Sequence, residues 1–189
     1  SCIILSGVKS KKLHSSRRDA FKVVNDKPIL EIDRNGKILS GKSKFAEKKE
    51  EFDVKFYKEG LKIGILKSHP NMCSKEISCF NGFDGLILEG TGLGHFPINE
   101  SNKGVFRELK KLKMPLVMTS QTIFGRVNMN VYATGRELQE FVLSGEDMLS
   151  EVAFIKLAYL LSNYKKDVEK LVGKNLRGEI NSKISDEFI

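Results

Sequence analysis

DGLILEGTG, at residues 84–92, is the stretch of this 189-residue sequence that decides its fold. An apolar run of this length that ends in a glycine-rich loop predicts a buried strand followed by a tight turn. Two further runs have the same form, LKIGILKS at 61–68 and MPLVMTSQT at 114–122. Each run is too short for a helix of its own. The sequence therefore predicts three buried strands, each followed by a polar or glycine-rich loop.

Helical patterns fill the gaps between these runs. Residues 73–80 form one short candidate helix, and residues 100–113 form a clearer one with apolar residues on a single face. Strands that alternate with helices at this spacing predict right-handed βαβ units and a parallel sheet. We therefore expect an α/β fold of three layers, with helices packed around a parallel sheet.

The last third of the sequence is predicted to be helical. Ser144 is a good N-cap residue and Asp147 is an acid suited to a first turn, which predicts a helix start there. EDMLSEVAFIKLAYLLSNY, at 146–164, is apolar on most sides, so this helix is expected to be buried against the sheet. Residues 166–176 predict a final helix, with Gly178 beyond its end.

The beginning of the sequence has a different pattern. SCIILSGV, at 1–8, predicts a buried strand, and KPILEIDRNGKILSG, at 27–41, predicts two short strands around an Asn-Gly turn. The charged stretch that follows is typical of an exposed linker. We predict a leading segment at 1–40, a linker at 41–58 and a C-terminal α/β domain at 59–189. The start with Ser inside an apolar run favours a processed or truncated N-terminus.

Composition and charge limit the classes of protein. Hydrophobic residues make up 40% and charged residues 30%, which is typical of a soluble globular protein. The net charge of +8 favours an acidic partner such as RNA, although a lysine-rich solvated surface also explains it.

Three cysteines without a pairing pattern fit a reduced cytoplasmic protein, and no zinc-ligand spacing occurs, so no metal site is predicted. No apolar run approaches the length of a membrane span, so no membrane contact is expected.

Ligands of an open parallel sheet bind beyond the carboxyl ends of its strands. Three segments are expected at this edge: 68–71, 89–95 and 119–122. The glycines of GTGLG, at 90–94, let the backbone approach a ligand closely. Pro97 follows where a dinucleotide-binding helix would begin, so that class of site is excluded, and a tight turn explains the glycines equally well. His95 is either a ligand contact or a capping residue at the edge of the sheet.

Hydroxyl nucleophiles are present, but the spacing of the residues identifies no catalytic partner for them. They are Ser15, Ser16, Thr91, Thr119 and Ser120. None lies in a G-x-S-x-G elbow, and the sequence has no P-loop. Pattern and composition by themselves therefore predict an α/β domain without assigning its chemistry.

Three stretches resemble the asparaginase/glutaminase family of amidohydrolases. They are KLHSSRRDAF at 12–21, DGLILEGTGLGH at 84–95, and TSQTIFGRVNMNVY at 119–132 with GEDML at 145–149. The third is most similar to one branch of the family, the glutaminase (D) subunits of archaeal glutamyl-tRNA(Gln) amidotransferases. The resemblance covers essentially the whole chain. It implies the three-layer fold of an asparaginase C-terminal domain, preceded by the end of a second α/β domain.

The resemblance also implies that Lys12 is catalytic. The family uses two Thr, an Asp and a Lys, and its Thr and Asp lie in T-G-G-T and T-D-T motifs that this sequence lacks, so this chain alone is expected to be inactive. Lys12 would take the proton that a Thr hydroxyl loses as it attacks an amide carbon. That role requires a pKa lowered by burial or by nearby cations, for which Lys9, Lys11 and Arg17 are candidates. The alternative is that Lys12 is one of several surface lysines.

The function implied is that of a glutaminase subunit. It would hydrolyse glutamine and pass ammonia to a partner, the kinase/transamidase (E) subunit of the amidotransferase, which converts Glu-tRNA(Gln) to Gln-tRNA(Gln) with ATP and Mg. No cofactor is expected in this chain. Family members form dimers with active sites near subunit contacts, which implies that Gly94 and His95 face a neighbour's site. Two alternatives are a fragment of a free-standing L-asparaginase and a non-catalytic module for assembly or tRNA contact.

Overall fold

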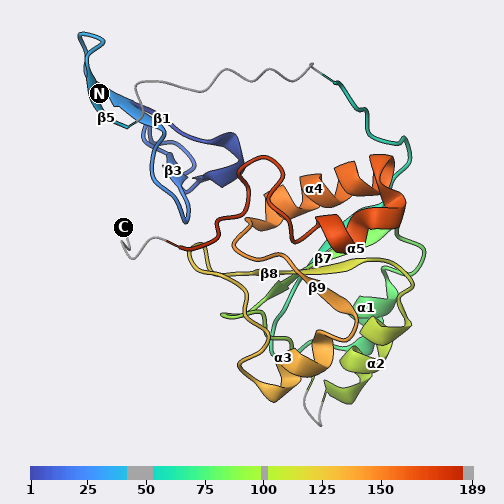
Figure 1. Ribbon diagram of the computed structural model, residues 1–189. Helices are drawn as coiled ribbons and strands as arrows, with labels where there is room; N and C mark the ends of the chain where they lie inside the picture. Colours follow the sequence, from blue (N-terminus) through green and yellow to red (C-terminus); the bar gives the residue numbers. More distant parts are fainter. Residues whose placement is uncertain (42–52, 99–101, 185–189) are drawn as a thin grey trace.

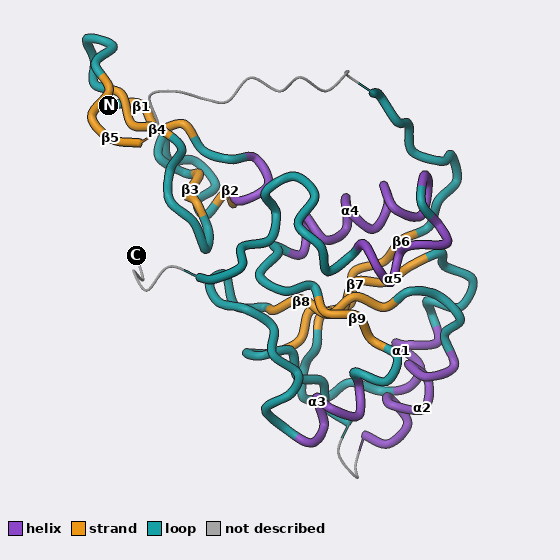
Figure 2. Tube along the Cα trace, viewed as in Figure 1, coloured by secondary structure: helices purple, strands orange, loops and turns teal. Residues whose placement is uncertain are grey.

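The chain forms two parts in the computed structural model, which describes residues 1–41, 53–98 and 102–184. The N-terminal part contains short antiparallel strands, and the second part is a parallel sheet covered by helices (Figure 1). Figure 2 shows the same division, with the α-helices of the described residues all in the second part. The prediction of an α/β fold is confirmed.

Four parallel strands form the main sheet, in the spatial order β6-β7-β8-β9, which is also their order along the chain. Their bounds are β6 Ile63–Lys67, β7 Gly85–Gly90, β8 Leu116–Ser120 and β9 Val142–Ser144. The first three are the strands predicted from the apolar runs. The fourth was not predicted, because three residues are too few to show a periodic pattern.

Helices connect these strands and cover both faces of the sheet (Figure 1). One face carries α1 Ser74–Ser78, α2 Lys103–Lys111 and α3 Ala133–Leu138, which lie between successive strands. The other face carries α4 Ser150–Asn163 and α5 Val168–Leu171. The predicted three-layer arrangement is therefore present.

Side chains of β7 alternate between two apolar cores. Leu86 and Leu88 belong to the core on the side of α1, α2 and α3, whereas Ile87 belongs to the core under α4 and α5. All three side chains are fully buried, as expected for a parallel strand covered on both faces. Gly85 lets α4 pack closely, because a Cβ there would lie 2.8 Å from Cδ2 of Leu157.

The long helix α4 begins at Ser150, so the helix start predicted at Ser144 is wrong. Ser144 ends β9, and the chain then turns through Glu146, whose φ is 56°. The prediction that this helix is buried against the sheet is correct, since Leu157 and Leu160 are fully buried.

The final predicted helix, at 166–176, is shorter in the structure. A 3-10 turn, η3 Lys165–Asp167, leads into α5, which ends at Leu171. Beyond α5 the chain is held by Glu179, whose carboxylate lies 2.6 Å from Nζ of Lys156 on α4. This ion pair is almost completely buried, and it fixes the C-terminal turns on the outer side of α4.

Two small antiparallel sheets form the N-terminal part, one in the order β1-β4-β5 and one of β2 and β3. The elements are β1 Cys2–Ile4, η1 Gly7–Lys9, β2 Ser10–Lys12, β3 Phe21–Val23, β4 Leu30–Ile32 and β5 Ile38–Gly41. The predicted Asn-Gly hairpin is the turn between β4 and β5, where Gly36 has a φ of 83°. The prediction of a buried first strand is wrong: β1 is an edge strand, and Ile3 is 53% exposed.

The predicted linker at 41–58 falls mostly outside the described residues, because 42–52 are not among them. The division into 1–40, 41–58 and 59–189 therefore remains a prediction. Within the described ranges, no helix combines the length and the apolar character needed to cross a bilayer.

Candidate functional site at the carboxyl edge of the sheet

A polar pocket of about 190 Å³ lies where the parallel strands end. Its wall is formed by Lys67 at the end of β6, Glu89 in β7, Ser120 at the end of β8 and Glu146 after β9. Lys11 and Asn25 of the N-terminal part close the pocket, together with Gln121, Thr122, Ile123, Gly125, Asp147, Met148, Leu149 and Ser150. The predicted ligand edge of the sheet is thus a real concavity, built from both parts of the chain.

Gln121 ties the strand ends together beneath this pocket. Its Nε2 donates hydrogen bonds to the carbonyl oxygens of Ser68, at 2.6 Å, and Glu89, at 2.9 Å. Its backbone N–H donates to the carbonyl oxygen of Gly90 at 2.8 Å. Both predicted loop segments after β6 and β7 are therefore fixed by the segment after β8.

The hydroxyls at the end of β8 have structural partners. Thr119 is fully buried and its Oγ1 lies 2.8 Å from Oγ of Ser150, at the start of α4. Ser120 donates to the carbonyl oxygen of Gly92 at 2.5 Å and lies 2.7 Å from the hydroxyl of Thr122. These contacts connect β8 with α4 and with the glycine loop, and they show no base of the kind that activates a nucleophile.

The loop after β7 folds back on itself between Thr91 and His95. Their backbones exchange two hydrogen bonds of 3.0 Å, which makes the glycine segment a tight turn. Gly94 is buried with a φ of +100°, and a Cβ there would lie 2.9 Å from both Met118 and Val127. This position therefore requires glycine for its conformation and for its close packing.

His95 is partly exposed beside this turn. Its Nδ1 lies 3.2 Å from the carbonyl oxygen of Thr91, so Nδ1 is the nitrogen that carries the proton in this contact. Its ring packs edge-on against Tyr132, with ring centroids 4.6 Å apart. Together with Thr134 they line an open hollow of about 460 Å³, separate from the polar pocket. The imidazole thus caps its own loop and still presents one edge to solvent.

Lys12, the residue implied to be catalytic, lies at the end of β2 opposite Phe21 of β3. It is exposed, whereas the neighbouring Lys11 lines the polar pocket. The structure does not bring Lys12 into the hollow beside Gly94 and His95, because neither lysine lines it. The burial expected around this amine is therefore not provided by the described residues.

The cations near Lys12 each have a carboxylate partner. Lys9 pairs with Asp147 at 2.7 Å, Lys11 with Glu151 at 2.6 Å, and Arg17 with Asp19 at 2.7 Å. The hydrogen bond from Arg17 holds the pKa of Asp19 at about 2, well below its usual value. For Glu151, burial raises the pKa, but the hydrogen bond and charge of Lys11 together with a backbone hydrogen bond outweigh it, so the net pKa is lowered. The expected cationic repulsion on Lys12 is thus largely neutralised.

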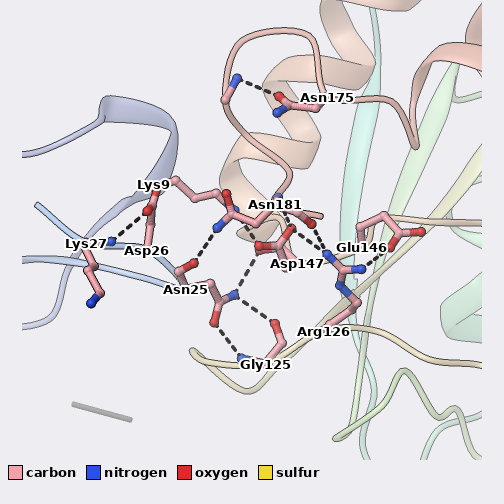
Figure 3. Close-up of polar contacts among 11 residues, drawn as sticks. Lys9, Asn25, Asp26, Lys27, Gly125, Arg126, Glu146, Asp147, Asn175 and Asn181 are labelled. Carbon is pink, nitrogen blue, oxygen red and sulfur yellow. Dashed lines mark hydrogen bonds and ion pairs between the residues drawn. The ribbon is translucent and has the colours of Figure 1, made fainter. Parts of the chain in front are cut away.

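A buried polar network joins the two parts of the chain (Figure 3), and two of its members, Asn25 and Asp147, also line the polar pocket. Lys9 is only 1% exposed, and its Nζ meets the carboxylate of Asp147 from the turn after β9. Asn181, near the end of the described chain, donates its backbone N–H to Asp147 Oδ1 at 3.0 Å. Sequence reasoning missed this site, because Asp147 was interpreted as the first-turn acid of a helix.

His69 and Glu76 form a partly exposed pair, with Nε2 2.7 Å from the carboxylate. The carboxylate of Glu76 also accepts a hydrogen bond from the backbone N–H of Cys73 at the start of α1. Across the parts of the chain that the structure describes, no group of three or more His, Cys, Asp and Glu is arranged to hold a metal ion.

The chain is similar to proteins of one family over nearly all of its length. Residues 62–172 match the Glutaminase/Asparaginase C-terminal domain. A Methanococcus maripaludis protein, named as the D subunit of glutamyl-tRNA(Gln) amidotransferase, is 44% identical over 98% of this chain and 46% of its own length. A protein of the same name from Pyrococcus abyssi is 38% identical over 95% of this chain and 42% of its own length. The chain thus spans less than half of these relatives.

Solved structures lead to the same family. The thermostable L-asparaginase from Thermococcus kodakarensis superposes with a TM-score of 0.81 at 25% identity, over 96% of this chain and 56% of that one. L-asparaginase I from Vibrio cholerae superposes with a TM-score of 0.76 at 30% identity, over 94% of this chain and 55% of that one. The match over 62–172 includes β6, β7, β8, β9 and α4, which build the sheet edge described above. This chain therefore belongs to the glutaminase/asparaginase family and contains its C-terminal domain.

Proposed function

We propose that this chain is part of the glutaminase subunit of a tRNA-dependent amidotransferase. The observation that carries the proposal is the 44% identity, over 98% of the chain, to a protein named as the D subunit of glutamyl-tRNA(Gln) amidotransferase. The complete enzyme would hydrolyse glutamine to glutamate and ammonia in the cytoplasm. A partner, the transamidase (E) subunit, would then use that ammonia, with ATP and Mg, to convert Glu-tRNA(Gln) to Gln-tRNA(Gln).

Lys12 is the proposed base of the glutaminase step. A Thr hydroxyl supplied from outside this sequence attacks the amide carbon of glutamine, and Lys12 accepts the hydroxyl proton. That proton then leaves with ammonia, and water releases glutamate from the acyl-enzyme. Lys12 is exposed on the β2–β3 hairpin, so a segment bearing the Thr can reach it there. That segment would also have to supply the burial that the role of a base requires.

The test requires the chain joined to a segment that carries the T-G-G-T and T-D-T motifs, taken from upstream in the gene or from a neighbouring gene. Glutamine and asparagine turnover are measured with and without the transamidase partner and tRNA(Gln). We expect glutamine to be preferred, and its turnover to respond to the transamidase partner and tRNA. The chain by itself should show no turnover. Glutamine turnover that ignored both additions would contradict the proposal.

Lys12→Met in the same assembly tests the base. Turnover should fall by at least about a hundredfold, within the usual range for loss of general-base catalysis, with the fold unchanged by circular dichroism. Lys22→Met is the matched control, because Lys22 lies on the other strand of the hairpin and makes only an exposed contact of 3.4 Å with Asp19. Full activity of the Lys12 variant would remove this residue from the mechanism.

A free-standing L-asparaginase is the second candidate, because both superposed structures bear that name. It would use the same Lys12 on asparagine, and neither a transamidase partner nor tRNA would alter its rate.

Gly94 and His95 are proposed to face the active site of a second copy in a dimer. Mixing an inactive Lys12→Met chain with a His95→Ala chain tests this idea, since activity should recover only if sites are shared between copies.

A further inference from the structure

We propose that the buried Lys9–Asp147 pair, together with Asn25, is a positioning device that fixes the hairpin carrying Lys12. The inference rests on the proposed function in one respect, namely that Lys12 is the base. Asn25 and Asp147 line the polar pocket, but the polar atoms of their side chains are bonded to Gly125, Lys9 and Asn181. These bonds place them in the support of the site and not in contact with substrate. They would act through the backbone, by holding the strand on which Lys12 lies.

The buried Lys9–Asp147 ion pair is not what is expected if its only role were to stabilise the fold. The side chains of Lys9 and Asp147 are 2% and 0% exposed, and their charged atoms are 2.7 Å apart. Burial of two charges is costly, and a well-packed apolar pair is often as stable or more stable. A buried pair does, however, accept only a narrow range of geometries. The pair is therefore better suited to fixing a position than to adding stability.

Asn25 fixes the other strand of the same hairpin (Figure 3). Its Nδ2 donates to the carbonyl oxygen of Gly125 at 2.9 Å, and its Oδ1 accepts from the N–H of Gly125 at 2.9 Å. The same Nδ2 lies 3.2 Å from the carbonyl oxygen of Asp147. Asn25 has a φ of 56°, so the backbone adopts a left-handed conformation to present this side chain.

These anchors lie at the base of the hairpin, and Lys12 lies farther along it. Lys9 immediately precedes β2, and Asn25 is separated from the end of β3 by a single residue, Val24. The N–H of Val24 donates to the carbonyl oxygen of Lys9 at 2.7 Å, which joins the two anchored positions to each other. A change at this base would tilt the hairpin and move the amine of Lys12 at its exposed end.

The test separates positioning from stability by comparing single and double variants of the assembled enzyme. Lys9→Met removes the closer cation of the buried Asp147 and leaves only the longer contact with Arg126, at 3.9 Å, so the variant should be destabilised. Lys9→Met with Asp147→Asn removes both charges of the pair, while Arg126 keeps its ion pair with Glu146 at 3.5 Å. The amide oxygen of Asn still accepts a hydrogen bond from the N–H of Asn181. The double variant should therefore recover most of the stability lost in the single variant.

Positioning predicts that the double variant does not recover catalysis. Its kcat for glutamine should remain about tenfold to a hundredfold below the unaltered enzyme, with KM within about twofold, because a small misplacement of a reacting group lowers the rate. Lys22→Met again serves as the control, with kcat within about twofold. If kcat returns together with stability in the double variant, the pair is merely structural and the inference is overturned.

Amide hydrogen exchange provides a readout that needs no activity. The N–H groups of Leu13 and Val24 bond across the hairpin at 2.7 Å, to Ala20 and Lys9 respectively. Both should exchange faster in the double variant, while the amides of β7 keep their protection. Unchanged protection of the hairpin amides would also overturn the inference. If instead Lys12→Met retains full turnover, the proposed role of Lys12 as the base fails while the exchange result stands by itself.

Discussion

Gly94 shows how a single residue shapes the loop that follows β7. Its φ of +100° is reached easily only by glycine, and its Cα faces Met118 and Val127 at close range. Gly92, two residues earlier in the same turn, also has a positive φ, of +51°, but open space surrounds it. The two glycines therefore differ in packing while they share the need for a left-handed backbone.

Replacement by alanine should separate these two effects. Gly94→Ala should lower the free energy of unfolding by about 2–4 kcal/mol, because backbone strain is added to overpacking. Gly92→Ala should lower it by only about 1 kcal/mol, from strain alone. Urea unfolding followed by circular dichroism measures both values. Equal losses would show that the contacts with Met118 and Val127 relax without cost.

Three neighbouring lysines differ in burial in a way that the sequence did not predict. Lys9, Lys11 and Lys12 occur within four residues, yet one is buried, one is partly exposed and one is exposed. No local pattern distinguishes them, because burial of Lys9 depends on Asp147, which is 138 residues away. The choice of Lys12 came from family resemblance, and the positioning role of Lys9 became visible only once the chain was folded.

Among the elements, α4 is the one that couples the sheet to the C-terminal turns. Leu157 packs on the sheet above Gly85, whereas Ile155 on the opposite side of the helix is 54% exposed. Leu157→Ala should lower the free energy of unfolding by about 2–5 kcal/mol, because it opens a cavity in a closed core. Ile155→Ala should change it by less than about 1 kcal/mol. Thermal unfolding of the two variants compares a buried and an exposed site on one helix.

The Lys156–Glu179 pair should make stability depend on acid pH. Burial raises the pKa of Glu179, but the hydrogen bond from Lys156 and those from the N–H groups of Leu176 and Arg177 outweigh it, so the net pKa is lowered. A lowered carboxyl pKa gives stability that is complete above the ordinary value of about 4.3 and is lost as pH falls through the folded value. Urea unfolding between pH 7 and pH 3 should therefore show this loss.

Substitution of Lys156 tests the same ion pair through its cation. Lys156→Met should lower the free energy of unfolding by about 3–5 kcal/mol at pH 7, because the carboxylate of Glu179 stays buried without its cation. Adding Glu179→Gln to that variant removes the stranded charge and should restore part of the loss. If the double variant is no more stable than Lys156→Met, the charge of Glu179 is not the source of the penalty.

Elements were predictable in proportion to their length and apolar content. The runs that became β6, β7 and β8 are largely apolar, so they identified three strands, of which β7 and β8 are buried as predicted. The edge strand β6 is not, since Ile65 is 43% exposed. The short elements β9 and α3 gave no such signal, and Gly135 within α3 weakens any helical pattern. In the structure Gly135 is needed because a Cβ would lie 2.4 Å from the carbonyl oxygen of Met129. Such close approaches arise from tertiary packing, which a local pattern does not record.

For the whole molecule, the two apolar cores draw all their members from residue 61 onward. A chain of residues 53–189 should therefore fold by itself, with a free energy of unfolding about 1–3 kcal/mol lower through the loss of contacts to Asp147 and Gly125. Far-UV circular dichroism should show the helices, and unfolding should remain cooperative. A molten, non-cooperative product would mean that the N-terminal part is needed to complete the core.

The general architecture of the molecule was predictable, but the junction of its two parts was not. Alternating strands and helices predicted a parallel three-layer fold, and the predicted ligand edge of the sheet does carry a polar pocket. The junction depends on contacts between Lys9, Asn25, Asp147 and Asn181, which lie far apart in the sequence. Each of these residues has an ordinary alternative role in a turn or cap, so the local sequence does not predict that they contact one another.

The order of the sheet also has a consequence for folding kinetics. Because β6, β7, β8 and β9 are neighbours in space in their chain order, the sheet can grow by short crossovers with modest loop-closure entropy. The Lys9–Asp147 contact closes a separation of 138 residues, so it should form after the rate-limiting step. Substitutions at Lys9 and Asn25 should then accelerate unfolding and leave the refolding rate nearly unchanged, with φ-values close to zero. The hairpin that bears Lys12 would thus be the last region to acquire its native geometry and the first to lose it.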